Sequence, residues 1–292
     1  MVSRANGHGG ARNGHGGAGY GAHDGAGSGT DEGVGYSTDE MMTVAAARAL
    51  RDGQVCFVGI GLPSAAANLA RATHAPSLVL VYESGTIGAK PTRLPLSIGD
   101  GELAETADAV VSVPEIFNYW LQAGRIDVGM LGAAQIDRFA NLNTTSIGDY
   151  ENAGVRLPGS GGAPEIAGSC RQVMVVLRQS PRTFVERVDF VSSVGYGTGP
   201  GAREALRLTG GGPVLVVSDL GTLRPDPATC ELVLTELHPG VDLEAAKAAT
   251  GWPLAVSPQL SVTAPPTREE LSVLRTLQKT GRAGVGSRPK AG

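Results

Sequence analysis

The sequence predicts an α/β fold in which an open, mostly parallel sheet is flanked by helices. Short apolar runs of strand length alternate with helical segments along the chain, as they do in proteins built from βαβ units. Glycine accounts for 43 of 292 residues and aromatic residues for only 4%, which favours tight strand-to-helix turns over an aromatic-rich β-sandwich. The body shows no internal repeat and no linker, so we expect one domain over residues 37–280.

The first helix and the unit that follows it are the best-marked elements. Residues 37–40, Ser-Thr-Asp-Glu, have the spacing of a capping box and precede a helical run over 41–51. A buried strand is expected over 54–58, a helix over 63–73 with proline in its first turn, and a second strand over 78–82. Strand, helix and strand in this order predict two parallel neighbouring strands.

Further elements are expected up to the C-terminal region. They are a helix over 114–123, a strand over 127–131, a polar Gly/Asn/Thr/Ser stretch up to Gly162, strands over 173–177 and 188–191, alternating strand and helix signals over 214–218, 231–236 and 243–249, and a helix over 267–279.

Both ends of the chain differ in composition from the body. Residues 1–36 hold 13 of the 43 glycines and almost no aliphatic side chains, so a disordered tail is expected there. His8, His15 and His23 in this tail lack the spacing of a metal site, and no metal is expected. Polar residues 281–292 are predicted to form a second, frayed tail.

Charge, hydropathy and cysteine content narrow the class of partner. The net charge is −4 and no basic block stands out, so neither nucleic acid nor a membrane surface is expected as a partner. No signal peptide and no apolar run of about 18 residues is present, which favours the cytoplasm. Cys56, Cys170 and Cys230 lie far apart, which argues against a disulfide framework and a zinc cluster and favours a reducing compartment.

Gly59-Ile60-Gly61, between a strand and a helix, partly matches the dinucleotide-binding fingerprint. The third glycine position holds Ser64, and Pro63 stands where backbone amides should turn toward a pyrophosphate. The sequence therefore argues against NAD or FAD.

Glu83 follows directly after the strand expected over 78–82 and precedes Ser84-Gly85. Open α/β sheets bind ligands outside the carboxyl ends of their strands, so Glu83 is a candidate site residue. A carboxylate can be a covalent nucleophile toward an activated electrophile such as a thioester. The spacing is equally compatible with a structural role, in which Glu83 caps the next helix or pairs with an arginine such as Arg93. Lys90 and Arg93 themselves could meet a substrate carboxylate or a CoA phosphate, although a solvated face is the simpler role.

A second group of polar residues follows the strand expected over 127–131. Residues 132–137 and 141–150 carry more amide and hydroxyl side chains than a turn needs, among them Gln135, Asn141 and Asn143. The turn at 159–163, Gly-Ser-Gly-Gly-Ala, can offer bare backbone N–H groups to an oxyanion or a phosphate. Glycine turns are common in so Gly-rich a chain, so this turn alone is a weak signal.

Taken in order, these blocks resemble the β subunit of family I coenzyme A transferases, of the glutaconate and 3-oxoacid CoA-transferase B type. The resemblance spans roughly residues 39–279, and its specific parts are 54–62, Glu83-Ser84-Gly85, 132–137, 141–150 and 159–163. It implies a CoA-transferase-like (NagB/RpiA-like) α/β sheet. It also implies an active site shared with a homologous α subunit in an αβ or α2β2 assembly.

The resemblance further implies ping-pong transfer of CoA from an acyl-CoA to a carboxylic acid through a glutamyl-CoA thioester. Glu83 would be the catalytic nucleophile, and no tightly bound cofactor is implied because CoA is a substrate. Backbone donors for the thioester oxygen would come from the CoA loop, Gly159, Ser160, Gly161, Gly162 and Ala163. Substrate contact or loop support would come from Ser84, Gly85, Gln135, Asn141 and Asn143.

Two alternatives stay open beside transfer. Some relatives of this subunit have lost the glutamate and hydrolyse or decarboxylate CoA thioesters, and retention of Glu83 favours transfer over these. The other alternative is a partner subunit with no catalytic role. One residue departs from the family pattern, because Ala140 stands where glycine usually precedes the asparagine and would be strained if φ there is positive.

Three further residues are interpreted structurally. His238 lies in a Leu-His-Pro-Gly turn and is expected to be structural rather than a general base. Tyr119 and Trp120 are expected to serve packing or subunit contact.

Overall fold

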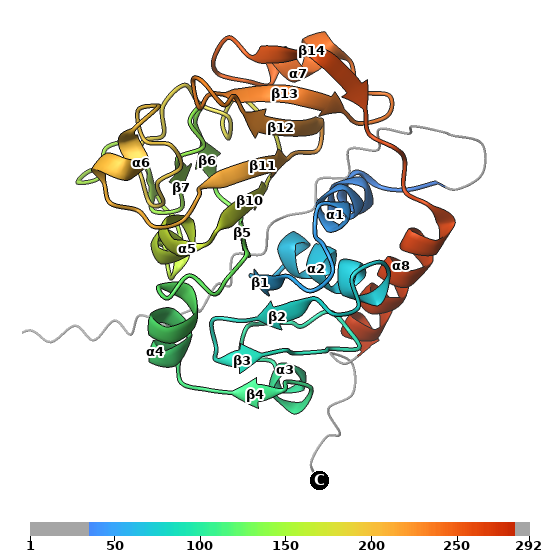
Figure 1. Cartoon of the computed structure of the whole chain (residues 1–292). Helices are drawn as coiled ribbons and strands as arrows, with labels where there is room; N and C mark the ends of the chain where they lie inside the picture. The colour runs from blue at the N-terminus through green and yellow to red at the C-terminus, as the bar shows by residue number, and fades with distance from the viewer. Residues whose placement is uncertain (1–34, 284–292) are drawn as a thin grey trace, which may run out of the picture.

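The computed structural model describes residues 35–283 and is built around one ten-stranded sheet (Figure 1). In sheet order its strands are β14 (Ala255–Val262), β13 (Leu232–Leu237), β12 (Gly221–Pro225), β11 (Pro213–Val217), β10 (Gln172–Val176), β5 (Val128–Leu131), β1 (Val55–Phe57), β2 (Val79–Val81), β3 (Thr86–Ile87) and β4 (Ala109–Val110). The five central strands, from β11 to β2, are parallel to one another. Antiparallel pairs flank them on both sides, and β13–β14 is again parallel. The expected α/β fold with a mostly parallel sheet is confirmed.

Helices pack on both faces of this sheet. One face carries α1 (Thr38–Arg48), α2 (Leu62–Ala72) and α8 (Arg268–Ala283), and the other carries η1 (Ile116–Leu121), α5 (Ala163–Ser169) and α7 (Leu243–Ala248). The remaining helices are α3 (Gly101–Glu105), α4 (Val113–Glu115) and α6 (Ala202–Ala205). Successive strand residues divide between the two cores, as Cys56 and Phe57 do, because side chains alternate along a strand.

The first elements match their sequence signals closely. The Ser37 hydroxyl accepts from the Glu40 N–H at 3.2 Å, and the Glu40 carboxylate accepts from the Ser37 N–H at 2.8 Å, so the capping box forms. Strands β1 and β2 pair in parallel with α2 as their crossover, as expected. Both therefore end at the same edge of the sheet, which is where Glu83 follows β2.

Two expectations from the sequence are corrected. Residues 188–191 form no strand; the Asp189 carboxylate instead accepts from Gln135 Nε2 and the Gly148 N–H, and Phe190 stacks on Tyr150. The polar stretch before Gly162 is not a plain loop but contains two small hairpins. These pair β6 (Gln135–Ile136) with β7 (Leu142–Asn143), and β8 (Ser146–Ile147) with β9 (Val155–Arg156).

Most of the two expected tails, including His8, His15 and His23, lies outside the described residues. At the C-terminal side, α8 continues to Ala283, three residues into the range expected to be frayed. Within residues 35–283, no helix is both long enough and apolar enough to cross a bilayer.

Candidate active site

Glu83 occupies a tight turn that joins β2 to the antiparallel β3. The Gly85 N–H donates to the Tyr82 carbonyl at 3.0 Å, so Glu83 and Ser84 are the two central residues of a β-turn. Gly85 has φ 108°, and a Cβ there would lie 2.0 Å from the Val111 carbonyl oxygen. Only glycine fits this position. Because a hairpin follows β2, Glu83 does not cap a helix.

Tyr82 anchors the turn from the opposite side of the sheet. Its side chain is fully buried beneath α2, where its hydroxyl lies 3.3 Å from Ser64 Oγ and accepts from Asn68 Nδ2 at 3.3 Å. Burial raises the pKa of the Tyr82 phenol. Ser64, in the third position of the partial dinucleotide fingerprint, is therefore buried against a tyrosine rather than open to a pyrophosphate.

The glycine turn at 159–163 lies against the Glu83 carboxylate. A Cβ built on Gly162 would be 3.4 Å from Glu83 Oε1, and one built on Gly161 would be 3.9 Å from the same atom. Neither the Gly161 nor the Gly162 N–H has an acceptor within the described chain. The structure thus brings together a carboxylate and two unengaged backbone donors that are far apart in the sequence.

Both ends of this turn are fixed. The Gly159 N–H donates to the Thr144 carbonyl at 2.9 Å, which ties the start of the turn to the polar hairpins. At the other end, the Ala163 N–H donates to the Ser160 carbonyl at 3.0 Å, and α5 begins directly. Gly159 has φ 103° and Gly161 has φ 49°, backbone conformations that glycine adopts without the steric cost of a Cβ.

Gln135 and Asn143 are buried and bond to one another rather than reaching Glu83. Asn143 Nδ2 donates to Gln135 Oε1 at 2.8 Å, and Asn143 Oδ1 accepts from the Thr145 N–H at 2.9 Å. Gln135 Nε2 donates to Asp189 Oδ2 at 3.1 Å. Of the two roles expected for these residues, the bonding pattern favours support of the loop.

Asn141 is likewise engaged on every side. Its Nδ2 donates to Asp137 Oδ2 at 3.0 Å and to the Gly197 carbonyl at 2.8 Å, while its Oδ1 accepts from the Gly195 N–H at 3.0 Å. Burial raises the pKa of the Asp137 carboxyl at the centre of this cluster. Ala140, directly before Asn141, has φ 56°, the left-handed conformation in which alanine costs about 1–2 kcal/mol. The backbone strain that was expected for a positive φ at Ala140 is therefore present.

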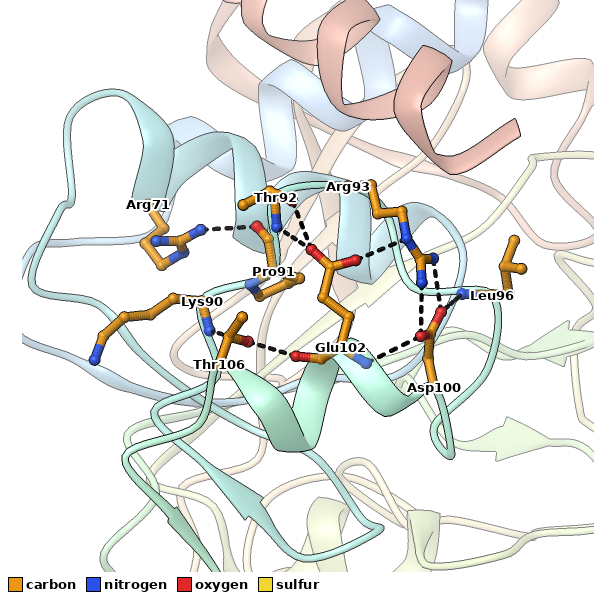
Figure 2. Close-up of polar contacts among 9 residues, drawn as sticks. All are labelled: Arg71, Lys90, Pro91, Thr92, Arg93, Leu96, Asp100, Glu102 and Thr106. Atoms are coloured by element: carbon orange, nitrogen blue, oxygen red, sulfur yellow. Dashed lines mark hydrogen bonds and ion pairs between the residues drawn. The ribbon is translucent and has the colours of Figure 1, made fainter. Parts of the chain in front are cut away.

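The two cations that follow Glu83 pair with other acids. Figure 2 shows Arg93 between Asp100 and Glu102: Nη1 and Nη2 each lie 2.8 Å from an Asp100 oxygen, and Nε lies 2.7 Å from Glu102 Oε2. The hydrogen bonds from Arg93 lower the pKa of Asp100 to about 2. Lys90 pairs with Asp108. Across residues 35–283, the Glu83 carboxylate has no hydrogen bond and no ion pair.

Phe117 is a neighbour of this site that the sequence did not reveal. A Cβ built on Gly162 would lie 2.5 Å from Phe117 Cζ, so the edge of the ring closes on the glycine turn. Phe117 belongs to the π-helix η1, whereas the sequence predicted a regular helix over 114–123. Nothing in the apolar spacing marks the extra residue in a π-helical turn, so this contact had no sequence signal.

The other candidate residues have structural surroundings. His238 is buried, with Nε2 2.8 Å from the Ser218 carbonyl and Nδ1 3.2 Å from Thr263 Oγ1, as expected for a structural histidine. Trp120 packs against the core, whereas Tyr119 is 63% exposed. Ser84 Oγ is buried and has no partner among the described residues.

No cysteine is disulfide-bonded, and burial raises the pKa of the Cys56 and Cys170 thiols, the latter to about 12. Among residues 35–283, no group of three or more His, Cys, Asp or Glu side chains is placed to hold a metal ion.

A family model described as coenzyme A transferase matches residues 39–249. The B-type subunit of 3-oxoadipate CoA-transferase from Pseudomonas knackmussii is 60% identical over 246 residues, which are 84% of this chain and 95% of that protein.

Two solved structures share the fold. Glutaconate coenzyme A-transferase from Acidaminococcus fermentans gives a TM-score of 0.80 at 32% identity, covering 87% of this chain and 98% of that chain. The decarboxylase AibA/AibB gives a TM-score of 0.73 at 25% identity, covering 85% and 98%. With the family model spanning most of the described residues and a transferase subunit matching almost end to end, this chain belongs to the coenzyme A transferase family.

Proposed function

We propose that this chain is the β subunit of a CoA-transferase and that Glu83 carries the covalent intermediate. The observation that supports this most strongly is that the Glu83 carboxylate lies close to two backbone N–H groups, and neither the carboxylate nor the N–H groups have a hydrogen-bond partner within the described chain. Glu83 has no bond to the described protein, and Gly161 and Gly162 lie beside it with free N–H groups. A carboxylate in an ion pair is a weaker nucleophile than one whose lone pairs are free.

The reaction proceeds in two mirrored halves. A Glu83 oxygen attacks the thioester carbonyl carbon of the donor, the C–S bond breaks, and a mixed anhydride and CoA thiolate result. The thiolate then attacks the Glu83 carbonyl carbon of the anhydride. The donor acid leaves as a carboxylate, and a glutamyl-CoA thioester remains. An acceptor carboxylate reverses these steps, so no proton is gained or lost overall.

The glycine turn supplies electrostatic stabilisation. When a nucleophile adds to the thioester or anhydride carbonyl, negative charge develops on its oxygen. The Gly161 and Gly162 N–H groups, which have no acceptor in the described chain, would donate to this oxygen. A single such donor is worth about a hundred- to a thousand-fold in rate. The bonds from Gly159 to Thr144 and from Ala163 to Ser160 hold the donors in place before the substrate binds.

A homologous α subunit, in an αβ or α2β2 assembly, is the expected partner. Within the described chain, Glu83 has no hydrogen bond or ion pair, and Gly161 and Gly162 lie near its carboxylate. The α subunit would supply the remaining contacts to the CoA thioester. The substrates are an acyl-CoA and a small carboxylic acid, and CoA is not a bound cofactor. The name of the 60% identical relative makes 3-oxoadipate the first acid to test. The free cysteines suit a reducing compartment, the cytoplasm.

The test uses the complex of this chain with its α partner. We expect Glu83→Gln to lower the rate of CoA transfer by about a thousand-fold or more while folding and assembly are unchanged, because the amide is not a nucleophile. The matched control is Glu151→Gln, at an exposed glutamate, which keeps the full rate. Full activity in the Glu83→Gln complex would eliminate the covalent role.

Decarboxylation or hydrolysis of a CoA thioester is the second candidate, favoured by the structural likeness to AibA/AibB. It differs from transfer in one measurable respect. A decarboxylase or hydrolase releases carbon dioxide or free CoA without an acceptor acid, whereas the transferase needs the acceptor for turnover. Steady acceptor-independent turnover of the wild-type complex would establish this second function.

A further inference from the structure

The aromatic edge of Phe117 occupies the space that Gly162 leaves empty. A Cβ at Gly162 would be 2.5 Å from Phe117 Cζ, 2.7 Å from Phe117 Cε1 and 3.4 Å from Glu83 Oε1. The ring edge and the carboxylate therefore approach the same glycine position. The ring edge itself consists of carbon atoms with no hydrogen-bonding capacity.

The position of the ring is fixed by a π-helical turn. The Gln122 N–H donates to the Phe117 carbonyl at 2.8 Å, a bond that spans five residues. Ile116 and Leu121, at the two ends of η1, are fully buried and anchor the turn in the core. The Phe117 ring also meets Phe57, at the end of β1, edge to face with centroids 6.1 Å apart. These contacts hold the ring in place.

We propose that Phe117 is a positioning residue that keeps water away from the Glu83 thioester and so favours transfer over hydrolysis. The inference rests on the proposed covalent role of Glu83. A water molecule is stably bound where it finds two to four polar partners. The phenyl edge fills space beside the Gly161 and Gly162 N–H groups and adds no further partner. The acceptor acid, by contrast, brings its own carboxylate and needs no bound water.

The competing reaction is the loss of the thioester to water. Water adds to the glutamyl-CoA carbonyl carbon, the C–S bond breaks, and CoA leaves as its thiol with one proton from the water. Glu83 returns as a carboxylate and the second water proton is released to solvent. In transfer, the acceptor carboxylate attacks the same carbon, so the two reactions share an intermediate and compete for it. The ratio of their rates reports what surrounds that carbon.

The test compares Phe117→Ala and Phe117→Leu with the wild type, each in complex with the α partner. CoA release without acceptor and CoA transfer with acceptor are measured on the same samples. For Phe117→Ala we expect the ratio of hydrolysis to transfer to rise by about tenfold, equivalent to about 1.4 kcal/mol, because water then fits beside the thioester. Leucine restores much of the apolar bulk, so its ratio should stay nearer the wild-type value.

Phe190→Ala is the matched control, because Phe190 is also half-buried and stacks on another ring, Tyr150, with centroids 5.1 Å apart. A loss of stability alone would lower both rates without changing their ratio. If Phe117→Ala does not assemble, Phe117→Leu carries the test with a smaller expected rise in the ratio. An unchanged ratio in the assembled variant, with a normal CoA adduct on Glu83, overturns the role of Phe117 alone. Absence of the adduct in the wild type overturns the proposed function and this inference with it.

Discussion

Among the acidic side chains of the described chain, Glu83 contrasts with those that hold the fold together. Glu40 pairs with Arg275, Glu270 with Arg48 and Asp100 with Arg93, each within hydrogen-bonding distance. Glu83 has no such partner in residues 35–283. Its candidacy could be read from the sequence, because a carboxylate after a buried strand marks a ligand site. The sequence could not show that Arg93 leaves Glu83 unpaired, because this depends on where the fold places Asp100 and Glu102.

The close contact at Gly162 leads to a prediction for Gly162→Ala. The added methyl must displace the Phe117 ring and presses on Glu83 Oε1. We expect CoA transfer to fall by about a hundred-fold, the effect of displacing one oxyanion donor. Steady-state kinetics of the assembled complex measure it.

Gly168→Ala is the control, in the helix α5 that Gly162 precedes, since a Cβ there would make only an ordinary 3.5 Å contact with Leu208. It should leave the rate unchanged. Equal loss of activity in the two variants would contradict a local effect at the Glu83 site.

His238 leads to a prediction about pH. Burial lowers the pKa of its imidazole below the ordinary value of 6.5. Below that value the unfolded chain takes up a proton that the folded chain does not, so acidification removes stability until the pH reaches the folded-state pKa. The stability advantage of the wild type over His238→Gln should therefore shrink as the pH falls from about 7 to about 5. Urea unfolding at several pH values measures it, and a constant difference would show that His238 titrates equally in both states.

Helices and strands that depend on short-range sequence signals were predicted correctly. The capping box at Ser37, the strand and helix around Gly59 and the helix at the C-terminal side all occur close to their expected bounds. The hairpins β6–β7 and β8–β9 were missed because their strands are two residues long and are held by buried side-chain amides such as Asn143. The strand expected over 188–191 was wrong: in this loop Val188 is buried and Phe190 stacks on Tyr150, whereas Val191 is exposed.

The stability of the segment after β3 depends on Arg93, and this dependence can be tested. Arg93 makes three contacts with Asp100 and Glu102, and these contacts link the two ends of the segment 90–106 (Figure 2). Arg93→Ala leaves the Asp100 carboxylate, whose side chain is 8% exposed, without its cation. We expect a loss of about 1–3 kcal/mol in unfolding free energy, and faster amide hydrogen exchange confined to this segment. Arg224→Ala, at an exposed arginine, is the control and should change neither measurement.

At the scale of the whole molecule, strand order creates the site. Glu83 follows β2 and the glycine turn precedes β10, and in the sheet only β1 and β5 separate these two strands. The sequence indicates both segments but not this order, because crossover connections leave no local signal. The outer strands were also missed. Strand β14 is mostly exposed and contains Pro258, so it lacks the alternating apolar pattern of a half-buried strand.

The proposed sharing of the Glu83 site with an α subunit predicts that this chain is inactive alone. Purified by itself, it should fold but show no CoA transfer. Adding the α partner should restore activity up to an equimolar ratio, because in the proposed assembly the partner completes the site. A titration of activity against added α subunit measures this, and full activity of the isolated chain would contradict a shared site.

Mass spectrometry of the peptide that contains Glu83 shows whether this residue carries CoA covalently. The complex is incubated with an acyl-CoA in the absence of an acceptor, quenched and digested. We expect a CoA-sized, hydroxylamine-sensitive adduct on Glu83 that disappears when the acceptor acid is added before the quench. No adduct, together with steady release of free CoA without acceptor, would rule out a covalent role and leave Glu83 as a residue that only positions the substrate.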